Sequence, residues 1–236
     1  MVVLDFFIVN VALPSMQRNL HASGSAIEWV VAGYSLTSAV FLISAGLLTQ
    51  LAFWCGQASF FLVLALYLQQ GRGMSALHAG LVFTILAAAY VVASAQAPTL
   101  SERYGRRLLA IGALVLAAGH AGLLAAVSDI GVGGSIVALI PGLVLIGAGM
   151  GLVIVPLTTT IMGGVAPEQA GAVSGALSTM QNVGGALGVA ITGVIFFGAL
   201  HSGYAHALEL SLAELAALLM TVASLTRLLP AHRRVG

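Results

Sequence analysis

Charge is what this sequence has least of. Only 6% of its 236 residues are charged, against roughly a quarter in a soluble domain, and none of them is a lysine. A soluble domain with so few polar groups could not cover its surface, so we expect lipid to be its main solvent. The formal net charge of +1 gives no reason to expect an acidic or nucleic-acid partner.

Cysteine is almost absent as well. Cys55 is the only one, which excludes an intrachain disulfide, and its apolar flanks favour a packing role over metal binding. The sequence shows no His, Cys, Asp and Glu set with metal-ligand spacing and no Ser, His and Asp arrangement typical of a hydrolase. We therefore expect no metal, no other cofactor and no enzymatic activity.

What the sequence has in abundance is long apolar runs, in keeping with a hydrophobic content of 60%. A bilayer core of ~30 Å is crossed by a helix of about 20 apolar residues. Lipid offers no water to unpaired backbone groups, which favours helices over open strands. We predict an all-α, polytopic transmembrane bundle of about eight helices, with candidate spans at 1–16, 28–48, 52–69, 77–98, 107–127, 135–160, 171–200 and 208–229.

The weakest break lies between the second and third spans. A straight helix over 28–69 would be ~60 Å long, twice the hydrocarbon thickness, so we expect a turn between Thr49 and Gln57. With that turn, two arginines fall on one side of the membrane, Arg18 and Arg72. The other six fall on the opposite side: Arg103, Arg106, Arg107, Arg227, Arg233 and Arg234. The positive-inside rule then places both termini in the cytoplasm of a cell-membrane protein.

Glycine is frequent, with 29 copies, and some copies have the spacing that lets two apolar helices approach closely. Three pairs follow the G-x-x-x-G pattern: Gly147/Gly151, Gly171/Gly175 and Gly184/Gly188. As a group they predict tight helix contacts in the second half of the chain.

Few polar side chains interrupt the apolar runs, and each has alternative interpretations. Asp5 is costly in hydrocarbon, unless it lies at the interface near a helix N-terminus. Gln181 and Asn182 lie inside an apolar run, where they line a substrate path or bond to a neighbouring helix. His120 has the surroundings of a packing residue, and Glu209 and Glu214 are interpreted as solvated or first-turn acids.

Several stretches resemble motifs of the major facilitator superfamily, in particular its fourteen-helix drug:proton antiporter branch. They are Leu4–Pro14, Trp29–Leu36, Tyr67–Gly71 with Ala79–Gly80, Pro98–Arg107, Pro167–Gly171 and Gln181–Gly188. The loop Pro98–Arg107 departs from the family pattern, because Pro98 replaces its leading glycine and Glu102 its aspartate.

The resemblance implies roles for two groups of residues. Asp5 would couple transport to protons. A cytoplasmic loop would form a conformational latch that pairs with neighbouring helix ends in one alternating-access state; its residues are Glu102, Arg103, Gly105, Arg106 and Arg107. The same arginines fit a plain positive-inside anchor, and both roles can hold together.

Measured against that family, about six internal helices are missing, with the join near Gln50. Residues 1–50 would be a remnant of the N-terminal half and 51–236 a six-helix C-terminal half. Only three residues precede Leu4, which makes the first helix short for a bilayer. Either this helix thins the bilayer around it or the true start of the chain lies upstream.

The implied function is proton-coupled efflux of small lipophilic or cationic compounds, with the bilayer, protons and the substrate as partners. The alternative is a remnant that inserts without transporting and packs on a full-length relative or on itself.

Overall fold

The computed structural model describes residues 46–105, 107–163 and 165–226, with side chains described up to Met220. Six long helices make up this part of the chain, and it contains no strand. The first is the helix Gly46–Gly71, whose last turn is the π-helical segment η1 (Tyr67–Gly71). The others are α3 (Ala76–Tyr104), α4 (Arg107–Ile130), α5 (Ile140–Met162), α6 (Ala170–Ala199) and α7 (Tyr204–Thr226).

Short 3₁₀ segments connect some of these helices: η2 (Ile136–Leu139), η3 (Pro167–Gln169) and η4 (Leu200–Ser202). Five helical stretches are long and apolar enough to cross a membrane: Gly46–Gly71, Ala76–Tyr104, Arg107–Ile130, Ile136–Met162 and Pro167–Ser202. The predicted all-α membrane fold is thus confirmed. Candidate span 1–16 and most of 28–48 lie outside the described residues.

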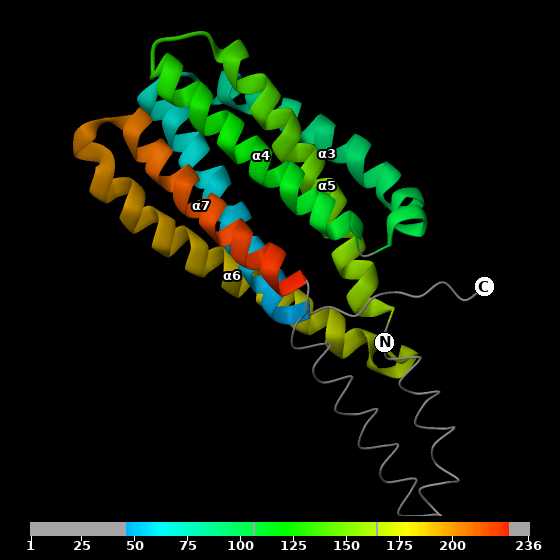
Figure 1. Cartoon of the computed structure of the whole chain (residues 1–236). Helices are drawn as coiled ribbons and strands as arrows, with labels where there is room; N and C mark the ends of the chain where they lie inside the picture. The colour runs from blue at the N-terminus through cyan, green and yellow to red at the C-terminus, as the bar shows by residue number, and fades with distance from the viewer. Residues whose placement is uncertain (1–45, 106, 164, 227–236) are drawn as a thin grey trace, which may run out of the picture.

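The helices form one bundle, built from neighbouring antiparallel pairs (Figure 1). α5 packs between α3 and α4, while α7 packs against both α4 and α6. The helix Gly46–Gly71 runs behind α4 and α7 in Figure 1 and contacts both: Phe60 lies against His120 of α4, and Gly56 against Leu215 and Leu218 of α7.

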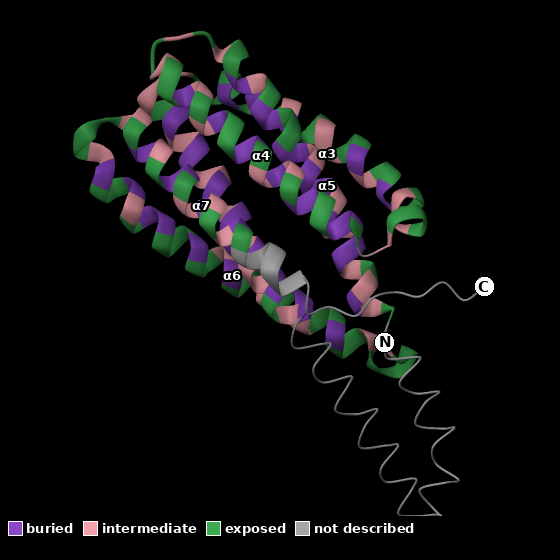
Figure 2. Cartoon of the chain, viewed as in Figure 1, coloured by how far each residue is buried: buried purple, intermediate pink, exposed green. Residues whose placement is uncertain are grey.

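Burial separates the centre of the bundle from its edge. In the most apolar stretch of each helix, 61% of the residues of Gly46–Gly71 are buried but only 17% of those of α3. Figure 2 shows buried residues facing the bundle interior and exposed residues covering the outer sides of α3 and α6. The helix Gly46–Gly71 is therefore the central element, and α3 and α6 flank it with largely uncovered apolar faces.

Two of the three glycine pairs lie at helix contacts, as predicted. A Cβ on Gly147 would collide with the carbonyl oxygen of Leu86, and one on Gly151 would lie 2.7 Å from the amide nitrogen of Ser94, both in α3. On α6, Gly184 and Gly188 lie directly against the backbone of the helix Gly46–Gly71. These contacts bring helix backbones together in the way that small residues allow within lipid.

The third pair gives a different result, because Gly171 and Gly175 have no described atom within 4 Å of a built Cβ.

The turn expected between Thr49 and Gln57 is wrong, since residues 46–66 form one uninterrupted α-helix. Thr49, Gln50 and Gln57 are buried against other helices, so these polar residues mark packing inside the bundle and not a chain reversal. The proposed boundary at residue 50 stays a prediction.

One end of the bundle is joined by an arginine clamp. The hydroxyl of Tyr67 donates to the carbonyl oxygen of Gly131 at 2.5 Å, and Arg72 donates to the same hydroxyl at 3.2 Å. Arg72 also donates to the carbonyl oxygen of Gly134. Gly131, at φ +54°, ends α4 in a conformation that glycine adopts readily. The clamp ties the helix Gly46–Gly71 to the connection between α4 and α5.

Candidate functional site

A groove lies between the helix Gly46–Gly71 and α6. Its wall on the first helix is formed by Trp54 and Ala58. The α6 wall is formed by Gln181, Asn182, Gly185, Ala186 and Val189. Gly184 and Gly188 bring the two backbones together beside it, and the small side chains Ala58, Gly185 and Ala186 leave the space open.

The groove lies at membrane depth. Trp54 comes seventeen residues before Gly71, the end of its helix, which corresponds to about 26 Å along the helix. Asn182 comes twelve residues after Ala170, about 18 Å along α6. Both positions lie inside apolar helical spans and not in the loops that connect them. Polar groups at this depth are costly and, as a rule, functional.

Trp54 is the residue that gives the groove its chemistry. Its indole nitrogen Nε1 is buried without a hydrogen-bond partner among the described residues, and so is Oε1 of Gln57, one turn further along the same helix. An indole N–H is a pure donor, and its ring face attracts cations. Burying this donor without a protein partner carries a desolvation cost, while the ring of Trp54 lines the groove.

The two interpretations of Gln181 and Asn182, a substrate path or a bond to a neighbouring helix, both stay predictions. Gln181 is half-buried and Asn182 exposed, and neither amide has a hydrogen bond to another described residue. They do not bond a neighbouring helix in this part of the chain. Instead, α6 brings both to the groove that faces Trp54, which sequence reasoning missed although a lone tryptophan inside an apolar helix was a visible signal.

A second groove, between α3 and α5, is a weaker candidate. It is lined almost entirely by aliphatic side chains, with Gln96 as its one polar residue. Ligand pockets combine apolar walls with a few converging polar groups that orient the ligand. The α6 groove meets that description, with an indole and two amides, and the α3–α5 groove does not.

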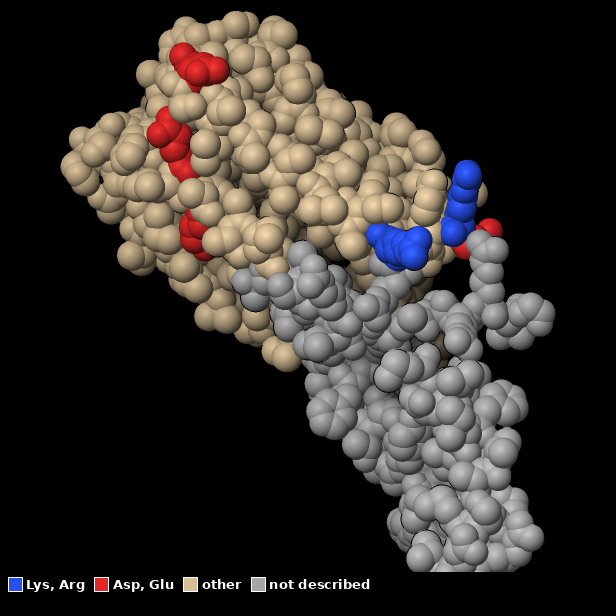
Figure 3. All heavy atoms as spheres, in the orientation of Figure 1, with Lys and Arg blue, Asp and Glu red and all other residues tan. Residues whose placement is uncertain are grey.

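The charged loop joins α3 to α4. Gly105 ends α3 at φ +54°, and its amide caps the helix by donating to the carbonyl oxygen of Ser101 at 2.8 Å. The guanidinium of Arg103 lies 5.5 Å from the ring centre of Tyr104. Glu102, Arg103 and Arg107 are exposed, while Arg106 lies outside the described residues. Figure 3 shows these basic groups at one end of the molecule, far from the acidic groups over α4 and α7. The latch role stays a prediction.

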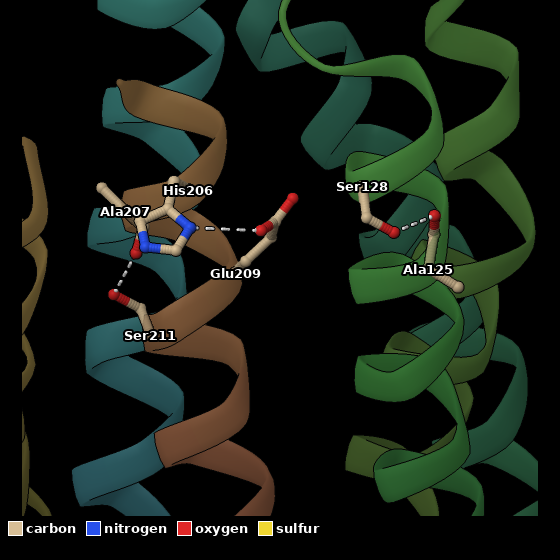
Figure 4. Close-up of polar contacts among 6 residues, drawn as sticks. All are labelled: Ala125, Ser128, His206, Ala207, Glu209 and Ser211. Atoms are coloured by element: carbon tan, nitrogen blue, oxygen red, sulfur yellow. Dashed lines mark hydrogen bonds and ion pairs between the residues drawn. The ribbon is translucent and has the colours of Figure 1, made fainter. Parts of the chain in front are cut away.

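Two residues on α7 were grouped together at the sequence level but differ in the structure. Glu209 pairs with His206 at 3.5 Å and is 27% exposed, which fits the expected solvated acid (Figure 4). Glu214 is half-buried in the middle of α7 and accepts a hydrogen bond of 2.8 Å from the hydroxyl of Thr192 on α6. The interpretation of Glu214 as a solvated or first-turn acid was therefore wrong.

Asp5 lies outside the described residues. His120 is 1% exposed, with Nδ1 2.9 Å from the carbonyl oxygen of Leu116 and its ring packed on Phe60, as expected for a packing residue. Among the described residues, no group of three or more His, Cys, Asp and Glu could hold a metal ion.

A bundle of long apolar helices with polar groups gathered in a groove between two apolar spans defines a polytopic membrane protein with a candidate small-molecule site. Comparison with known proteins identifies the family of this membrane protein. Residues 46–189 match the Major Facilitator Superfamily, and the chain belongs to this family. The resemblance seen in its motifs is thereby confirmed.

Similar curated proteins are named for drug and antibiotic export or resistance. The chain is 37% identical over 160 residues to the probable actinorhodin transporter of Streptomyces coelicolor, covering 67% of this chain and 28% of that protein. It is 35% identical over 145 residues to a puromycin resistance protein of Streptomyces alboniger, covering 61% of this chain and 29% of that protein. It is also 51% identical over 51 residues to the multidrug resistance protein Stp of Mycobacterium tuberculosis, covering 22% of this chain and 10% of that protein. The matched stretch thus spans less than a third of each relative's length.

Proposed function

We propose that this chain acts in the efflux of small lipophilic or cationic compounds across the cell membrane, with both termini in the cytoplasm. The observation that carries the proposal is the groove of Trp54, Gln181 and Asn182, with its unpartnered indole N–H at membrane depth. An aromatic face next to two amides suits a flat or cationic compound with one or two polar atoms. The names of two relatives, an actinorhodin transporter and a puromycin resistance protein, support efflux of small compounds.

Proton coupling is the second part of the proposal. Asp5 would take up and release the proton, and Glu102, Arg103, Gly105, Arg106 and Arg107 would bias the two access states. Arginine suits this role because its planar guanidinium holds a carboxylate or a helix C-terminus in a fixed geometry. The family motifs in the sequence support both assignments.

The groove is tested with energised membrane vesicles that contain the chain and a fluorescent lipophilic cation. Trp54→Phe keeps the ring and removes the N–H donor, and Asn182→Ala removes one amide. We expect each to slow pH-gradient-driven transport at least fivefold, about 1 kcal/mol of lost binding. Gln69→Ala is the matched control, since this exposed amide lies outside the groove. Equal rates for all three variants would contradict the groove assignment.

Coupling is tested in the same vesicles with Asp5→Asn. Transport driven by the pH gradient should be abolished, while binding of the cation to the groove should be retained. Unchanged transport in this variant would contradict the role of Asp5. Equal accumulation in vesicles with and without the chain would contradict transport altogether.

One observation favours a second candidate, a membrane protein that packs on a full-length relative or on a second copy of itself. Only 17% of the apolar stretch of α3 and 33% of that of α6 are buried, so two helices present wide apolar faces. Helices in lipid associate through such faces where small residues allow close approach. Sedimentation of the chain in detergent micelles distinguishes the two, because a monomeric mass contradicts self-association.

A further inference from the structure

Glu214 is an acidic residue near the middle of α7, the helix that contains most of the last predicted membrane span, 208–229. It lies ten residues from Tyr204 and twelve from Thr226, the two ends of α7. These separations correspond to about 15 Å and 18 Å along the helix axis. The flanking sequence is apolar, with Leu212 and Leu215 both buried in the bundle. The carboxyl group therefore lies within the hydrocarbon thickness and not at a membrane surface.

The carboxyl group has one polar partner. Thr192, which is fully buried on α6, donates its hydroxyl to Oε2 of Glu214 at 2.8 Å. Nearby Ser211 is already engaged, because its hydroxyl donates to the carbonyl oxygen of Ala207 at 2.9 Å (Figure 4). The contact between α6 and α7 is thus the place where this carboxyl group is held.

No cation neutralises this carboxyl group among the described residues. α6 carries no titratable side chain between Ala170 and Ala199, and the helix Gly46–Gly71 brings only the thiol of Cys55 near it. On α4, Arg107 and Asp129 lie near the two helix ends, and the ring of His120 is engaged with Leu116 and Phe60. On α7 itself, His206 is paired with Glu209.

An ionised carboxylate without a cation is costly in hydrocarbon, and its neutral form is far less so. We propose that Glu214 is a proton-binding site inside the membrane, where its carboxyl group takes up and releases a proton at the contact between α6 and α7. On uptake, a proton from water forms an O–H bond at Oε1, while Thr192 continues to donate to Oε2. On release that O–H bond breaks and the proton returns to water. The site is separate from Asp5, and it stands whether or not the chain transports a solute.

The proposal is tested by dicyclohexylcarbodiimide labelling of the whole chain in lipid vesicles across a pH series. This apolar reagent attacks protonated carboxyl groups: the acid proton moves to a reagent nitrogen, and the carboxyl oxygen bonds to the central carbon. At neutral pH we expect at least about tenfold more label on Glu214 than on Glu209, because the insertion cost of a mid-membrane ionised acid exceeds one decade in population. Glu209 is the matched control on the same helix, already paired with His206. Equal labelling of both acids would overturn the proposal.

A second measurement keeps the test independent of reagent access. The infrared difference spectrum between the chain and its Glu214→Gln variant should show a protonated carboxylic C=O band at neutral pH, lost only in strong alkali. Thr192→Val, which removes the donor to the carboxylate, should increase the protonated fraction severalfold at alkaline pH, whereas Thr192→Ser should leave it unchanged. Absence of the C=O band at neutral pH in the unmodified chain would also overturn the proposal.

Discussion

α5 and α6 are both rich in glycine, yet the two helices use it differently. On α5, Gly142 and Gly149 lie against the backbone of α4, and Gly147 and Gly151 lie against α3. On α6, only Gly184 and Gly188 meet another backbone, and other glycines such as Gly198 have no described atom within 4 Å of a built Cβ. α5 has a helix on two sides, whereas most of α6 lies at the edge of the bundle.

The comparison shows that glycine spacing permits a close helix contact but does not specify one. The contact also needs a partner helix at the right level. This difference can be tested position by position on the two helices.

The largest effect is expected for Gly147→Leu on α5. Its side chain would have to enter the backbone of α3 at the carbonyl oxygen of Leu86, so neither helix can adapt by a rotamer change alone. We expect a loss of about 3 kcal/mol in the free energy of unfolding, the upper range for overpacking. Equilibrium unfolding in mixed micelles, followed by circular dichroism, measures it. If Gly147→Leu lost less unfolding free energy than the α6 variants, the close glycine contacts of α5 would contribute less to stability than those of α6.

Gly188→Ala tests the one close contact of α6. Even a methyl group would collide with the carbonyl oxygen of Cys55, and that backbone belongs to the central helix. We expect a loss of about 2 kcal/mol by the same measurement, because a single methyl group displaces less than a leucine. Gly185→Ala serves as the neighbouring control, since its Cβ would lie at an ordinary 3.4 Å from that of Ala58. Similar losses for both would show that the contact at Gly188 is looser than described.

Thr192→Val asks whether α6 is also held by polar contacts. The substitution keeps the shape but removes the hydroxyl that donates to Glu214 on α7. The expected loss is about 1 kcal/mol, typical of a single side-chain hydrogen bond between membrane helices. Thermal unfolding of the detergent-solubilised chain measures it, with Thr179→Val, an exposed threonine on the same helix, as control. If Thr192→Val lost more unfolding free energy than Gly188→Ala, the hydrogen bond to Glu214 would hold α6 more strongly than its close glycine contact does.

Tyr204→Phe tests the exposed end of α7, where the hydroxyl of Tyr204 donates to Gln70 at 3.2 Å. An exposed hydrogen bond competes with water, so its loss should cost about 0.5 kcal/mol or less. Proteolysis of the connection between α6 and α7 should speed up only slightly. A large increase would show that this bond holds the end of α6 in place.

No loss of stability is expected for Gly198→Ala at the uncovered end of α6. No described atom lies within 4 Å of the added methyl group, and alanine favours helix over glycine. The unfolding free energy should stay the same or rise by up to about 1 kcal/mol. Destabilisation here would mean that even the uncovered glycines of α6 serve a contact.

The helices themselves could be predicted from the sequence, because a bilayer requires long apolar segments and leaves few alternatives. Their ends could not. The predicted span 77–98 stops at a proline, yet α3 continues through Pro98 to Tyr104. The turn expected between Thr49 and Gln57 was wrong: the length of the apolar run 28–69 required a break but did not fix its place, and the central helix runs unbroken over 46–66 with Thr49, Gln50 and Gln57 buried. Burial depends on which helices surround a segment, and a single run of sequence does not contain that information.

The candidate site was only partly predictable for the same reason. Gln181 and Asn182 stood out as amides in an apolar run, and the structure does place them in a groove. Trp54, which supplies the unpartnered donor of that groove, comes from a helix more than 120 residues earlier in the chain. Glu214 was indistinguishable from a solvated acid until α6 was found beside it, with Thr192 aimed at its carboxyl group.

Arg72 shows how the meaning of one arginine depends on what it touches. Counting arginines by loop treats it as evidence against the predicted topology, since it falls on the side with fewer positive charges. In the structure its guanidinium is occupied by the Tyr67 hydroxyl and by carbonyl oxygens at the end of α4, where a helix carries partial negative charge. This positive charge is thereby tied to a folded feature, the end of α4. A lysine there could not make the same set of contacts with one planar group.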